Sequence, residues 1–264
     1  MDTTHAQELA LVTGASSGIG YQLARQFAEH GFDLVIVAED DGIEVAAQEL
    51  RGYGTQVHPI RVDLAAPTGV ERLLAETRAL RRPVTAAALN AGVGRGGAFL
   101  DTDIADEQEV IDLNITSTVR LVKGLLPPMV EAGSGRLLIT SSIASTMPGS
   151  FQAVYNATKS FLQSFAQALR EELKDTGVTV TSLMPGPTDT DFFRRADMLD
   201  TPVGRSDKDD PAQVAAQGYE ALMAGKGKLV AGSLKTKAQG MANHVLPDRL
   251  KAVAHRRMAE PSSR

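Results

Sequence analysis

The chain contains no cysteine among its 264 residues, and this absence removes several kinds of chemistry. Disulfides, thiolate nucleophiles and cysteine-ligated zinc are all excluded. Histidine could still bind a metal, but the histidines are scattered and no two stand at metal-ligand spacing. They are His5, His30, His58, His244 and His255. We therefore expect no metal site.

Long apolar runs and a surplus of basic residues are also missing. No run approaches the roughly 20 apolar residues needed to cross a bilayer. The first residues, MDTTHAQE, lack the basic and apolar regions of a signal peptide. The formal net charge is −5 at pH 7, which gives no overall attraction to nucleic acid. The sequence predicts a cytoplasmic protein that binds neither membranes nor nucleic acid.

What the chain does contain is a regular alternation of apolar, strand-like runs and amphipathic segments. The runs expected to form buried strands are 9–13, 33–38, 56–62, 84–90, 135–141 and 178–184. The clearest helical patterns lie at 21–31, 70–80 and 155–173. Such alternation indicates βαβ units, a mainly parallel sheet and helices on both faces. No repeat or linker interrupts it, so residues 1–264 are expected to form a single α/β domain.

Two segments depart from this alternation. Residues 187–211 are turn-rich and charged, and their length suits a mobile lid over a substrate. Residues 234–264 form a basic C-terminal extension without aromatic residues for stacking on bases. Apolar residues are interspersed among its charges, which favours a helix packed on the same or a neighbouring subunit over binding to nucleic acid. Its last residues, EPSSR, are expected to be disordered.

A glycine-rich turn follows the first expected strand. The stretch LALVTGASSGIGYQLARQF places Gly14, Gly18 and Gly20 between a strand and a helix. Glycine lets the chain turn tightly and approach a ligand, and the following helix offers free N–H groups to a pyrophosphate. The spacing is G-x-x-x-G-x-G rather than the G-x-G-x-x-G of many dinucleotide sites. A nucleotide site is favoured, and the alternative is a glycine-rich turn without a ligand.

Tyr155 and Lys159 stand four residues apart in a helical segment, so they share one face of the helix. A free phenol has a pKa of about 10. An ammonium about 4 Å away, at an effective dielectric near 20, contributes about 4 kcal/mol, or roughly three pKa units. This would bring the phenol close to pH 7, where an acid–base catalyst is most effective. The alternative is a pair of exposed residues on an interface helix.

Together these motifs resemble those of the short-chain dehydrogenase/reductase family. The resemblance rests on TGASSGIG (13–20), NAG (90–92), Asn114, Ser142, Tyr155-x-x-x-Lys159 and PG (185–186). It implies a Rossmann-like, doubly wound α/β fold with a mainly seven-stranded parallel sheet, helices on both faces and one domain. It also implies a nicotinamide cofactor, hydride transfer to or from a carbonyl or secondary alcohol, and a homodimer or homotetramer.

The resemblance assigns roles to individual side chains. Tyr155 passes the proton as general acid or base, and Ser142 hydrogen-bonds the substrate oxygen, with Ser141 as the alternative. Lys159 also holds the nicotinamide ribose. Asn114 helps to hold Lys159, unless it is simply a polar helix residue. The expected cofactor contacts are Gly14, Ser16, Ser17, Gly18, Ile19, Gly20, Glu39, Asp63, Leu64, Asn90, Ala91, Gly92, Tyr155, Lys159, Pro185, Gly186, Thr188 and Thr190.

The end of the second expected strand bears on the choice between NAD and NADP. In the family a carboxylate here binds the adenosine ribose hydroxyls, and Glu39 stands one position beyond the usual place. Asp40 and Asp41 follow, and no cation is evident for a 2′-phosphate. NAD is therefore favoured over NADP. The alternative is that Asp40 or Asp41 only caps the next helix, and Asp63 could likewise be a cap rather than an adenine ligand.

Apolar side chains around these motifs predict a medium-sized, largely apolar carbonyl or secondary alcohol as substrate. Arg194 and Arg195 could bind an anionic group of that substrate, or they could simply be solvated. The candidate substrate contacts are Val93, Gly94, Met147, Phe151, Phe192 and Phe193.

Two rival functions use the same fold. One is a catalytically silent nucleotide-sensing or scaffold protein, and the other is a cofactor-assisted isomerase or dehydratase. A sensor protein does not need a phenol with an adjusted pKa, which argues against the first rival. The glycine spacing and the short C-terminal part favour a simple reductase over the second. Turnover of the cofactor with added carbonyls separates the three.

Overall fold

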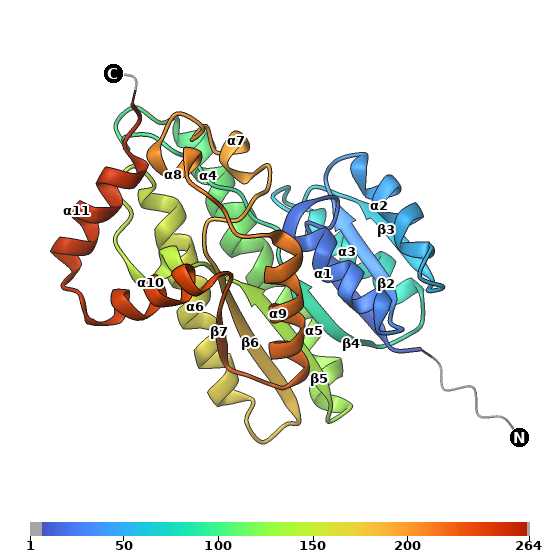
Figure 1. Cartoon of the computed structure of the whole chain (residues 1–264). Coiled ribbons are helices and arrows are strands. Elements are labelled where there is room, and N and C mark those ends of the chain that lie inside the picture. Colours follow the sequence, from blue (N-terminus) through green and yellow to red (C-terminus); the bar gives the residue numbers. More distant parts are fainter. Residues whose placement is uncertain (1–6, 263–264) are drawn as a thin grey trace, which may run out of the picture.

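Seven parallel strands form the centre of the computed structural model, which describes residues 7–262 (Figure 1). Their order across the sheet is β3-β2-β1-β4-β5-β6-β7, and every neighbouring pair is parallel. The chain winds outward from β1 in one direction and then returns to wind outward in the other. The strands are β1 (Leu9–Thr13), β2 (Asp33–Ala38), β3 (Val57–Arg61), β4 (Val84–Leu89), β5 (Gly135–Thr140), β6 (Val178–Pro185) and β7 (Lys228–Ala231).

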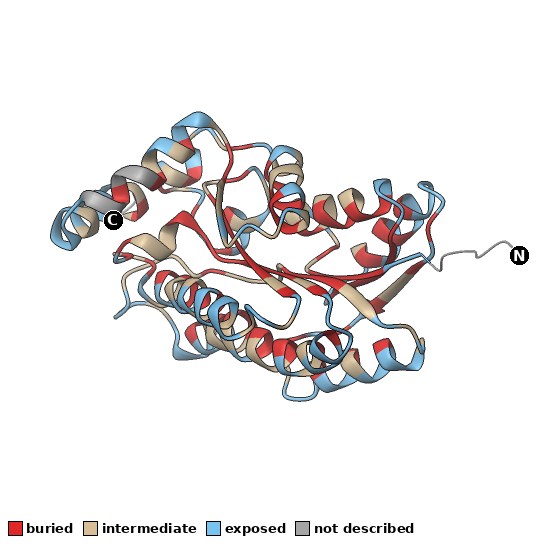
Figure 2. Ribbon diagram, turned by 90° about the horizontal axis from the view of Figure 1, so that it is seen from below, coloured by how far each residue is buried: buried red, intermediate tan, exposed pale blue. Residues whose placement is uncertain are grey.

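Helices cover both faces of this sheet. One face is covered by α1 (Gly18–Glu29), α2 (Gly42–Arg51) and α9 (Pro211–Met223). The other is covered by α3 (Gly69–Ala79), α5 (Thr118–Glu131) and α6 (Ala153–Glu172). Figure 2 shows the buried sheet between helices whose outer sides are exposed.

The pattern of the strand residues explains this two-sided burial. In β1, Ala10 and Val12 belong to the core under α1 and α9, whereas Leu9 and Leu11 belong to the core under α3 and α5. Side chains of a strand alternate between faces, so a strand buried on both sides must be apolar throughout. The predicted doubly wound, mainly parallel α/β fold is confirmed.

The remaining elements gather at the carboxyl ends of the strands and beyond β6. They are α4 (Ile104–Ile111), the π-helical η1 (Asp112–Ser117), the 3₁₀-helical η2 (Ile143–Thr146), α7 (Phe192–Arg195), α8 (Pro202–Arg205), α10 (Leu234–Val245) and α11 (Asp248–Ala259). In Figure 1, α7, α8 and α11 lie at the same end of the molecule.

Residues 187–211, the segment expected to be a lid, leave and rejoin the body of the protein at one place. The amide of Asp209 donates to the carbonyl of Pro187 at 2.8 Å, and the amide of Asp189 donates to the carbonyl of Asp209 at 2.9 Å. The buried Asp209 carboxylate accepts hydrogen bonds from Ser233 N (3.0 Å) and Thr236 Oγ1 (2.5 Å). Both ends of the segment are therefore fixed beside β7.

The predicted strands match the observed ones to within two residues at each end, and the predicted helices begin one to three residues later than the observed ones. Gly31 follows α1 with a φ of 81°, a left-handed conformation that glycine adopts without strain. Within residues 7–262 no helix is both long and apolar enough to cross a bilayer, and no three potential ligand side chains cluster as a metal site would need.

The predictions for the N-terminal residues and for the end of the C-terminal extension concern, in part, residues that the structure does not describe. His5, the first six residues and the final pair, Ser263 and Arg264, lie outside the described residues. The basic extension itself forms α10 and α11, and α11 packs on α8 of the same chain.

Candidate active site

A cavity of about 970 Å³ opens at the carboxyl ends of the strands. Its wall includes the glycine turn after β1, the ends of β2 to β6, the start of α6, the 187–211 segment and parts of α10 and α11. The chain reverses its winding direction between β1 and β4, and ligands of doubly wound sheets bind outside the strand ends at such a point. The fold therefore places this cavity where this architecture binds dinucleotides.

The glycine turn has the shape of a phosphate cradle. Gly14 and Gly18 have φ values of 67° and 56°. A Cβ on Gly18 would lie 2.9 Å from Thr190 Cγ2, and one on Gly14 would lie 3.0 Å from Ala91 Cα. The helix α1 begins here without a side-chain cap and without an acidic residue in its first turn. The free N–H groups at the start of α1 can bind the pyrophosphate of a dinucleotide, and Gly14 and Gly18, which lack side chains, let it approach the backbone.

Gly20, an expected cofactor contact, does not line the cavity. A Cβ at this position would lie 2.0 Å from the carbonyl oxygen of Gly14. Gly20 therefore lets α1 pack against the turn, and its contact with a cofactor stays a prediction.

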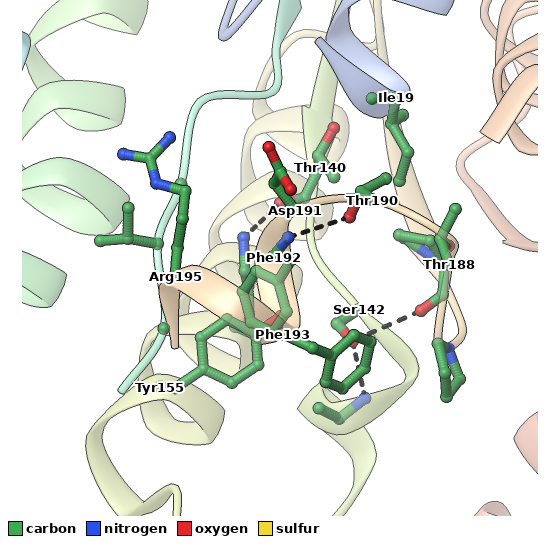
Figure 3. Close-up of a pocket in the computed structure, with 18 of the residues that line it drawn as sticks. Ile19, Thr140, Ser142, Tyr155, Thr188, Thr190, Asp191, Phe192, Phe193 and Arg195 are labelled. Carbon is green, nitrogen blue, oxygen red and sulfur yellow. Dashed lines mark hydrogen bonds between the residues drawn. The ribbon is translucent and has the colours of Figure 1, made fainter. Parts of the chain in front are cut away.

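Tyr155, Ser142 and Lys159 meet on the opposite wall of the cavity. Helical spacing puts Lys159 beside the phenol, with Nζ 5.7 Å from the centre of the Tyr155 ring. Lys159 Nζ donates to the carbonyl oxygen of Thr140 at 3.1 Å. Burial is the larger influence on the pKa of the Tyr155 phenol, and the nearby Ser142 hydroxyl partly offsets it by lowering that pKa. Figure 3 shows Tyr155 and Ser142 facing the same space.

The expected pKa near 7 for Tyr155 is wrong for this arrangement. Burial raises the pKa of Tyr155 to about 12, because the phenolate would lose more hydration than the Ser142 hydroxyl returns. Burial likewise lowers the pKa of Lys159 to about 8. The expectation of a pKa near 7 considered only the charge of Lys159 and assumed that Tyr155 and Lys159 both stay hydrated. Both groups instead lose hydration by burial.

The two candidate serines have distinct surroundings. Ser141 Oγ donates to the carbonyl oxygen of Lys159 at 2.8 Å and so holds α6 against β5. Ser142 Oγ lies near Tyr155, accepts from Ala144 N at 3.1 Å and caps η2. The geometry favours Ser142 as the group that meets a substrate oxygen.

Asn114 is fully buried and does not line the cavity. Its amide forms a matched pair of 2.9 Å hydrogen bonds with the backbone N–H and carbonyl of Val93, and it also donates to Thr158 Oγ1. Gly92 lies between Asn114 and Lys159. A Cβ added to Gly92 would lie 3.0 Å from Asn114 Oδ1 and 3.2 Å from Lys159 Nζ. Asn114 therefore positions the 92–93 backbone. It sits in the π-helical η1, a distortion frequent at functional sites.

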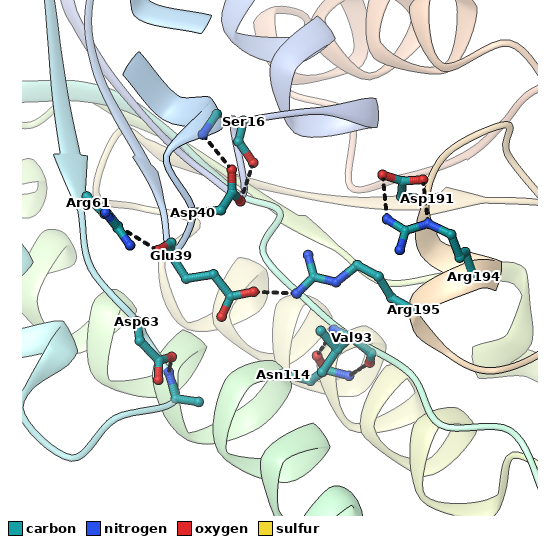
Figure 4. A network of polar contacts seen from close by, with 12 residues as sticks. Ser16, Glu39, Asp40, Arg61, Asp63, Val93, Asn114, Asp191, Arg194 and Arg195 are labelled. Atoms are coloured by element: carbon teal, nitrogen blue, oxygen red, sulfur yellow. Dashed lines mark hydrogen bonds and ion pairs between the residues drawn. The ribbon is translucent and has the colours of Figure 1, made fainter. Parts of the chain in front are cut away.

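The adenosine end of the cavity is more cationic than the sequence suggested. Glu39 follows β2, and its carboxylate forms an ion pair with Arg195 of α7 (Figure 4). Arg61 Nε donates to the backbone carbonyl of Glu39 at 3.1 Å, and its guanidinium also pairs with Asp41. The expectation that no cation lies here is wrong, because the fold brings both arginines from distant parts of the chain.

The side chains of Asp40 and Asp63 both accept hydrogen bonds from nearby backbone amides. Asp40 Oδ1 accepts from Gly42 N at 2.9 Å at the start of α2, and Asp40 Oδ2 accepts from Ser16 Oγ at 2.8 Å. Asp40 therefore ties the first residue of α2 to the glycine turn, whereas Asp41, the N-cap residue, makes no side-chain cap bond. Asp63 accepts from Ala65 N at 2.8 Å in a local turn rather than at the start of α3, and it lines the cavity.

At the substrate end, aromatic rings close over the phenol. The rings of Tyr155 and Phe192 have centroids 5.1 Å apart (Figure 3). A Cβ on Gly94 would lie 2.6 Å from Phe192 Cζ, so this glycine makes room for the ring. The expected substrate contact at Phe151 stays a prediction. Its side chain packs with Phe193 in a cluster beside the cavity, under the Arg256 guanidinium, and does not line the wall.

All the other predicted site residues line the cavity. They are Gly14, Ser16, Ser17, Gly18, Ile19, Glu39, Asp63, Leu64, Asn90, Ala91, Gly92, Val93, Gly94, Ser142, Met147, Tyr155, Lys159, Pro185, Gly186, Thr188, Thr190, Phe192 and Phe193.

Several residues that line the cavity were not predicted from the sequence. Gln152 stands one turn before Tyr155, and its buried Nε2 has no hydrogen-bond partner in the described part of the chain. His255 and Met258 reach the wall from α11. The pKa of His255 is lowered by burial, and its Nδ1 lies 2.9 Å from the Ser150 carbonyl oxygen. The position of Gln152 so close to Tyr155 was a usable signal, whereas nothing in the tail sequence indicated that α11 would fold back.

Comparison with known proteins decides the family. The model of the family described as short chain dehydrogenase matches residues 8–198. The chain is a short-chain dehydrogenase. The dehydrogenase is 32% identical to Oxidoreductase UcpA of Salmonella typhimurium over 81% of this chain and 79% of that protein. It is 33% identical to Sulfoacetaldehyde reductase 2 of Chromohalobacter salexigens over 70% of this chain and 74% of that protein.

Solved structures agree with this assignment. A short-chain dehydrogenase from Sphingobium yanoikuyae, in complex with NADPH, superposes with a TM-score of 0.79 at 26% identity and covers 97% of this chain and 99% of its own. L-Sorbose reductase from Gluconobacter frateurii, in complex with NADPH and L-sorbose, gives 0.75 at 26% identity, with coverage of 89% and 99%. The dehydrogenase is therefore an NAD(P)-dependent oxidoreductase acting on CH–OH and C=O groups.

Proposed function

We propose that the dehydrogenase interconverts a carbonyl compound and a secondary alcohol, with Tyr155 as general acid and base. The observation that carries this proposal is that Tyr155, Ser142 and Lys159 all line one cavity, with Lys159 buried beside the phenol ring. Asn114 is a positioning residue that holds the backbone next to Lys159.

In the direction of reduction, the Tyr155 hydroxyl donates its proton to the carbonyl oxygen, and Ser142 Oγ donates a hydrogen bond to the same oxygen. The bound nicotinamide supplies the hydride to the carbonyl carbon. The Lys159 ammonium, held by Thr140, stabilises the phenolate that remains on Tyr155. In the direction of oxidation the same phenolate accepts the proton of the alcohol.

We propose NAD rather than NADP as the preferred cofactor. Glu39 stands at the end of β2 and lines the cavity, where its carboxylate can accept from both hydroxyls of the adenosine ribose. Asp40 and Asp41 add negative charge next to it, which disfavours a 2′-phosphate.

The substrate proposed is a medium-sized, largely apolar ketone or secondary alcohol. Support comes from the rings of Phe192 and Phe193 and from Met147 on the wall near Tyr155, with the 187–211 segment as a lid. Gln152 adds one uncommitted N–H group in reach of a polar substituent.

A homodimer or homotetramer in the cytoplasm completes the proposal. Phe165 and Leu169 of α6 pack against the core, whereas Phe161 stacks on Phe165 and remains 40% exposed. A second copy of the chain could cover that ring.

Replacing Tyr155 with Phe tests the catalytic assignment. The Tyr155→Phe variant should lose at least about a hundredfold in turnover, because general acid catalysis contributes that much or more. Its dissociation constant for NADH, measured by nicotinamide fluorescence without tryptophan background, should change less than twofold. A screen of ketones with NADH and NADPH would provide the substrate. Substantial turnover by the variant would contradict the role of Tyr155.

A further inference from the structure

The carboxylate of Glu39 forms an ion pair with one arginine and lies near a second. Arg195 pairs with it from α7, 156 residues away along the chain. Arg61, from the end of β3, donates to the backbone carbonyl of Glu39, and its guanidinium pairs with Asp41. Figure 4 shows the two guanidinium groups approaching Glu39 from different elements. Glu39 therefore occupies the place beside Arg195 where another anion could pair with this guanidinium.

This site lies at the position that distinguishes the two nicotinamide cofactors. A carboxylate at the end of the second strand accepts from the ribose 2′-hydroxyl of NAD, whereas an arginine nearby accommodates the 2′-phosphate of NADP. The chain has both groups here, and they neutralise each other. Glu39 and Arg195 both line the cavity, and both side chains remain partly exposed, at 41% and 45%.

We propose that the Glu39–Arg195 ion pair sets the cofactor preference, with Glu39 occupying the site in which Arg195 would otherwise bind a 2′-phosphate. The proposal rests on the proposed function, since it concerns the same dinucleotide. It differs from a preference set by Glu39 alone, because it makes a residue of the 187–211 segment a partner of the adenosine ribose. The Glu39 carboxylate competes with a phosphate for the Arg195 guanidinium, so removing the charge of Glu39 leaves that guanidinium free to pair with a phosphate.

The neighbouring Arg194 provides a matched control. It belongs to the same short helix, but its guanidinium turns away and pairs with Asp191 at 3.0 Å. Replacement of Arg194 removes the same charge from the same segment without touching Glu39. A general electrostatic effect would therefore respond equally to both arginines, and the ion pair would respond only to Arg195.

The experiment measures the dissociation constants of NADH and NADPH by nicotinamide fluorescence for the full chain and its variants. Glu39→Gln should weaken NADH about tenfold and tighten NADPH about tenfold, since hydrogen bonds to charged groups contribute at least this much. Adding Arg195→Gln should abolish the gain for NADPH, and adding Arg194→Gln should leave it. The gain should also shrink as salt rises from about 0.05 to about 0.5 M, because the Debye length falls from roughly 14 to roughly 4 Å and the screening changes from weak to strong.

Three results would overturn the proposal. In the first, Glu39→Gln gives no gain for NADPH although its thermal midpoint matches that of the unmodified protein. In the second, the gain survives Arg195→Gln. In the third, Arg194→Gln removes the gain as fully as Arg195→Gln does. Binding of neither dinucleotide by the unmodified protein is a separate result, which would overturn the proposed function and this inference with it.

Discussion

Burial acts in opposite directions on the two ionisable groups at the reaction site. It raises the pKa of Tyr155 to about 12 and lowers that of Lys159 to about 8. At pH 7 the phenol therefore carries its proton, and the ammonium remains charged. The fold prepares the pair for donating a proton, which is the step that carbonyl reduction requires.

The buried ammonium should also destabilise the protein in a defined pH range. Its pKa is about 8 when folded and 10.5 when exposed, so the unfolded chain binds more protons between these values. The free energy of unfolding is reduced by the full amount below pH 8, by about 3 kcal/mol. That reduction disappears as the pH rises through 8 toward 10.5.

Lys159→Met should therefore stabilise the protein at pH 7 while removing activity. We expect a gain of about 1–3 kcal/mol in the free energy of unfolding, less than the full penalty because the bond to Thr140 is also lost. Urea unfolding at pH 7 and pH 10 measures it, and the gain should shrink at pH 10. Above pH 10 the raised pKa of Tyr155 lowers the stability of both proteins equally. A variant less stable than the parent at pH 7 would contradict the cost assigned to the buried charge.

Sequence reasoning reached some residues of this site and missed others for a simple reason. Tyr155 and Lys159 are one helical turn apart, so their proximity follows from local geometry. Glu39 and Arg195 are brought together only by the path of the 187–211 segment, which no periodicity describes. The error in the pKa of Tyr155 has the same origin, because burial depends on the whole wall.

At the scale of elements, the first turn of α1 tolerates no side chain at Gly20, where the helix packs against the turn after β1. A Cβ on Gly20 would meet the carbonyl oxygen of Gly14 at 2.0 Å, and this backbone atom belongs to the phosphate cradle itself. Neither the helix nor the turn can move without disturbing the other. The cradle and the start of α1 therefore form one rigid unit.

Gly20→Ala should weaken both folding and cofactor binding. We expect a loss of about 2–4 kcal/mol in the free energy of unfolding, as for other severe steric clashes, and at least about tenfold weaker NADH binding. Gly31→Ala is the control, since Gly31 has nothing within 4 Å of its added Cβ and only a φ of 81° to strain. It should cost about 1 kcal/mol and leave the NADH dissociation constant unchanged. Equal effects of both variants on NADH would contradict the steric account.

Six of the seven strands could be predicted from apolar runs in the sequence, and one could not. The first six strands carry apolar runs long enough to be recognised, and all were located. The seventh, β7, was implied only by the family resemblance. It has four residues at the edge of the sheet, begins with the exposed Lys228 and has no continuous buried run. Short edge strands need no such run, because one side of their backbone faces no neighbour.

At the scale of the whole molecule, α11 closes the substrate side of the cavity. Ala259 is 1% exposed and packs against Phe193, Ala196 and Met198 of the 187–211 segment. His255 and Met258 of the same helix reach the cavity wall. The C-terminal extension therefore supports the proposed lid from outside.

Ala259→Asp should loosen that support without changing the dinucleotide site. A carboxylate buried among apolar side chains costs several kcal/mol unless the helix moves away, so α11 should detach locally. We expect the KM for the carbonyl substrate to rise at least about fivefold, since each 1.4 kcal/mol of lost binding is a factor of ten. The NADH dissociation constant should stay within twofold. Val253→Asp, on the same helix but 47% exposed, is the control and should change neither. A rise in KM for both variants would show that charge on α11, rather than packing, matters.

The cavity draws its reactive groups and its covering surfaces from different stretches of the chain. Tyr155, Lys159, Ser142 and the glycine turn all precede the end of β6, whereas Phe192, His255 and Met258 follow it. The later stretch contacts the earlier one through bonds such as Gly96 N–H to the Ala196 carbonyl at 2.8 Å and Lys251 Nζ to the Thr146 carbonyl at 3.1 Å. Mutations after β6 can thus alter which molecule is accepted while the proton donor stays in place. Selectivity and chemistry in this protein are free to evolve at separate rates.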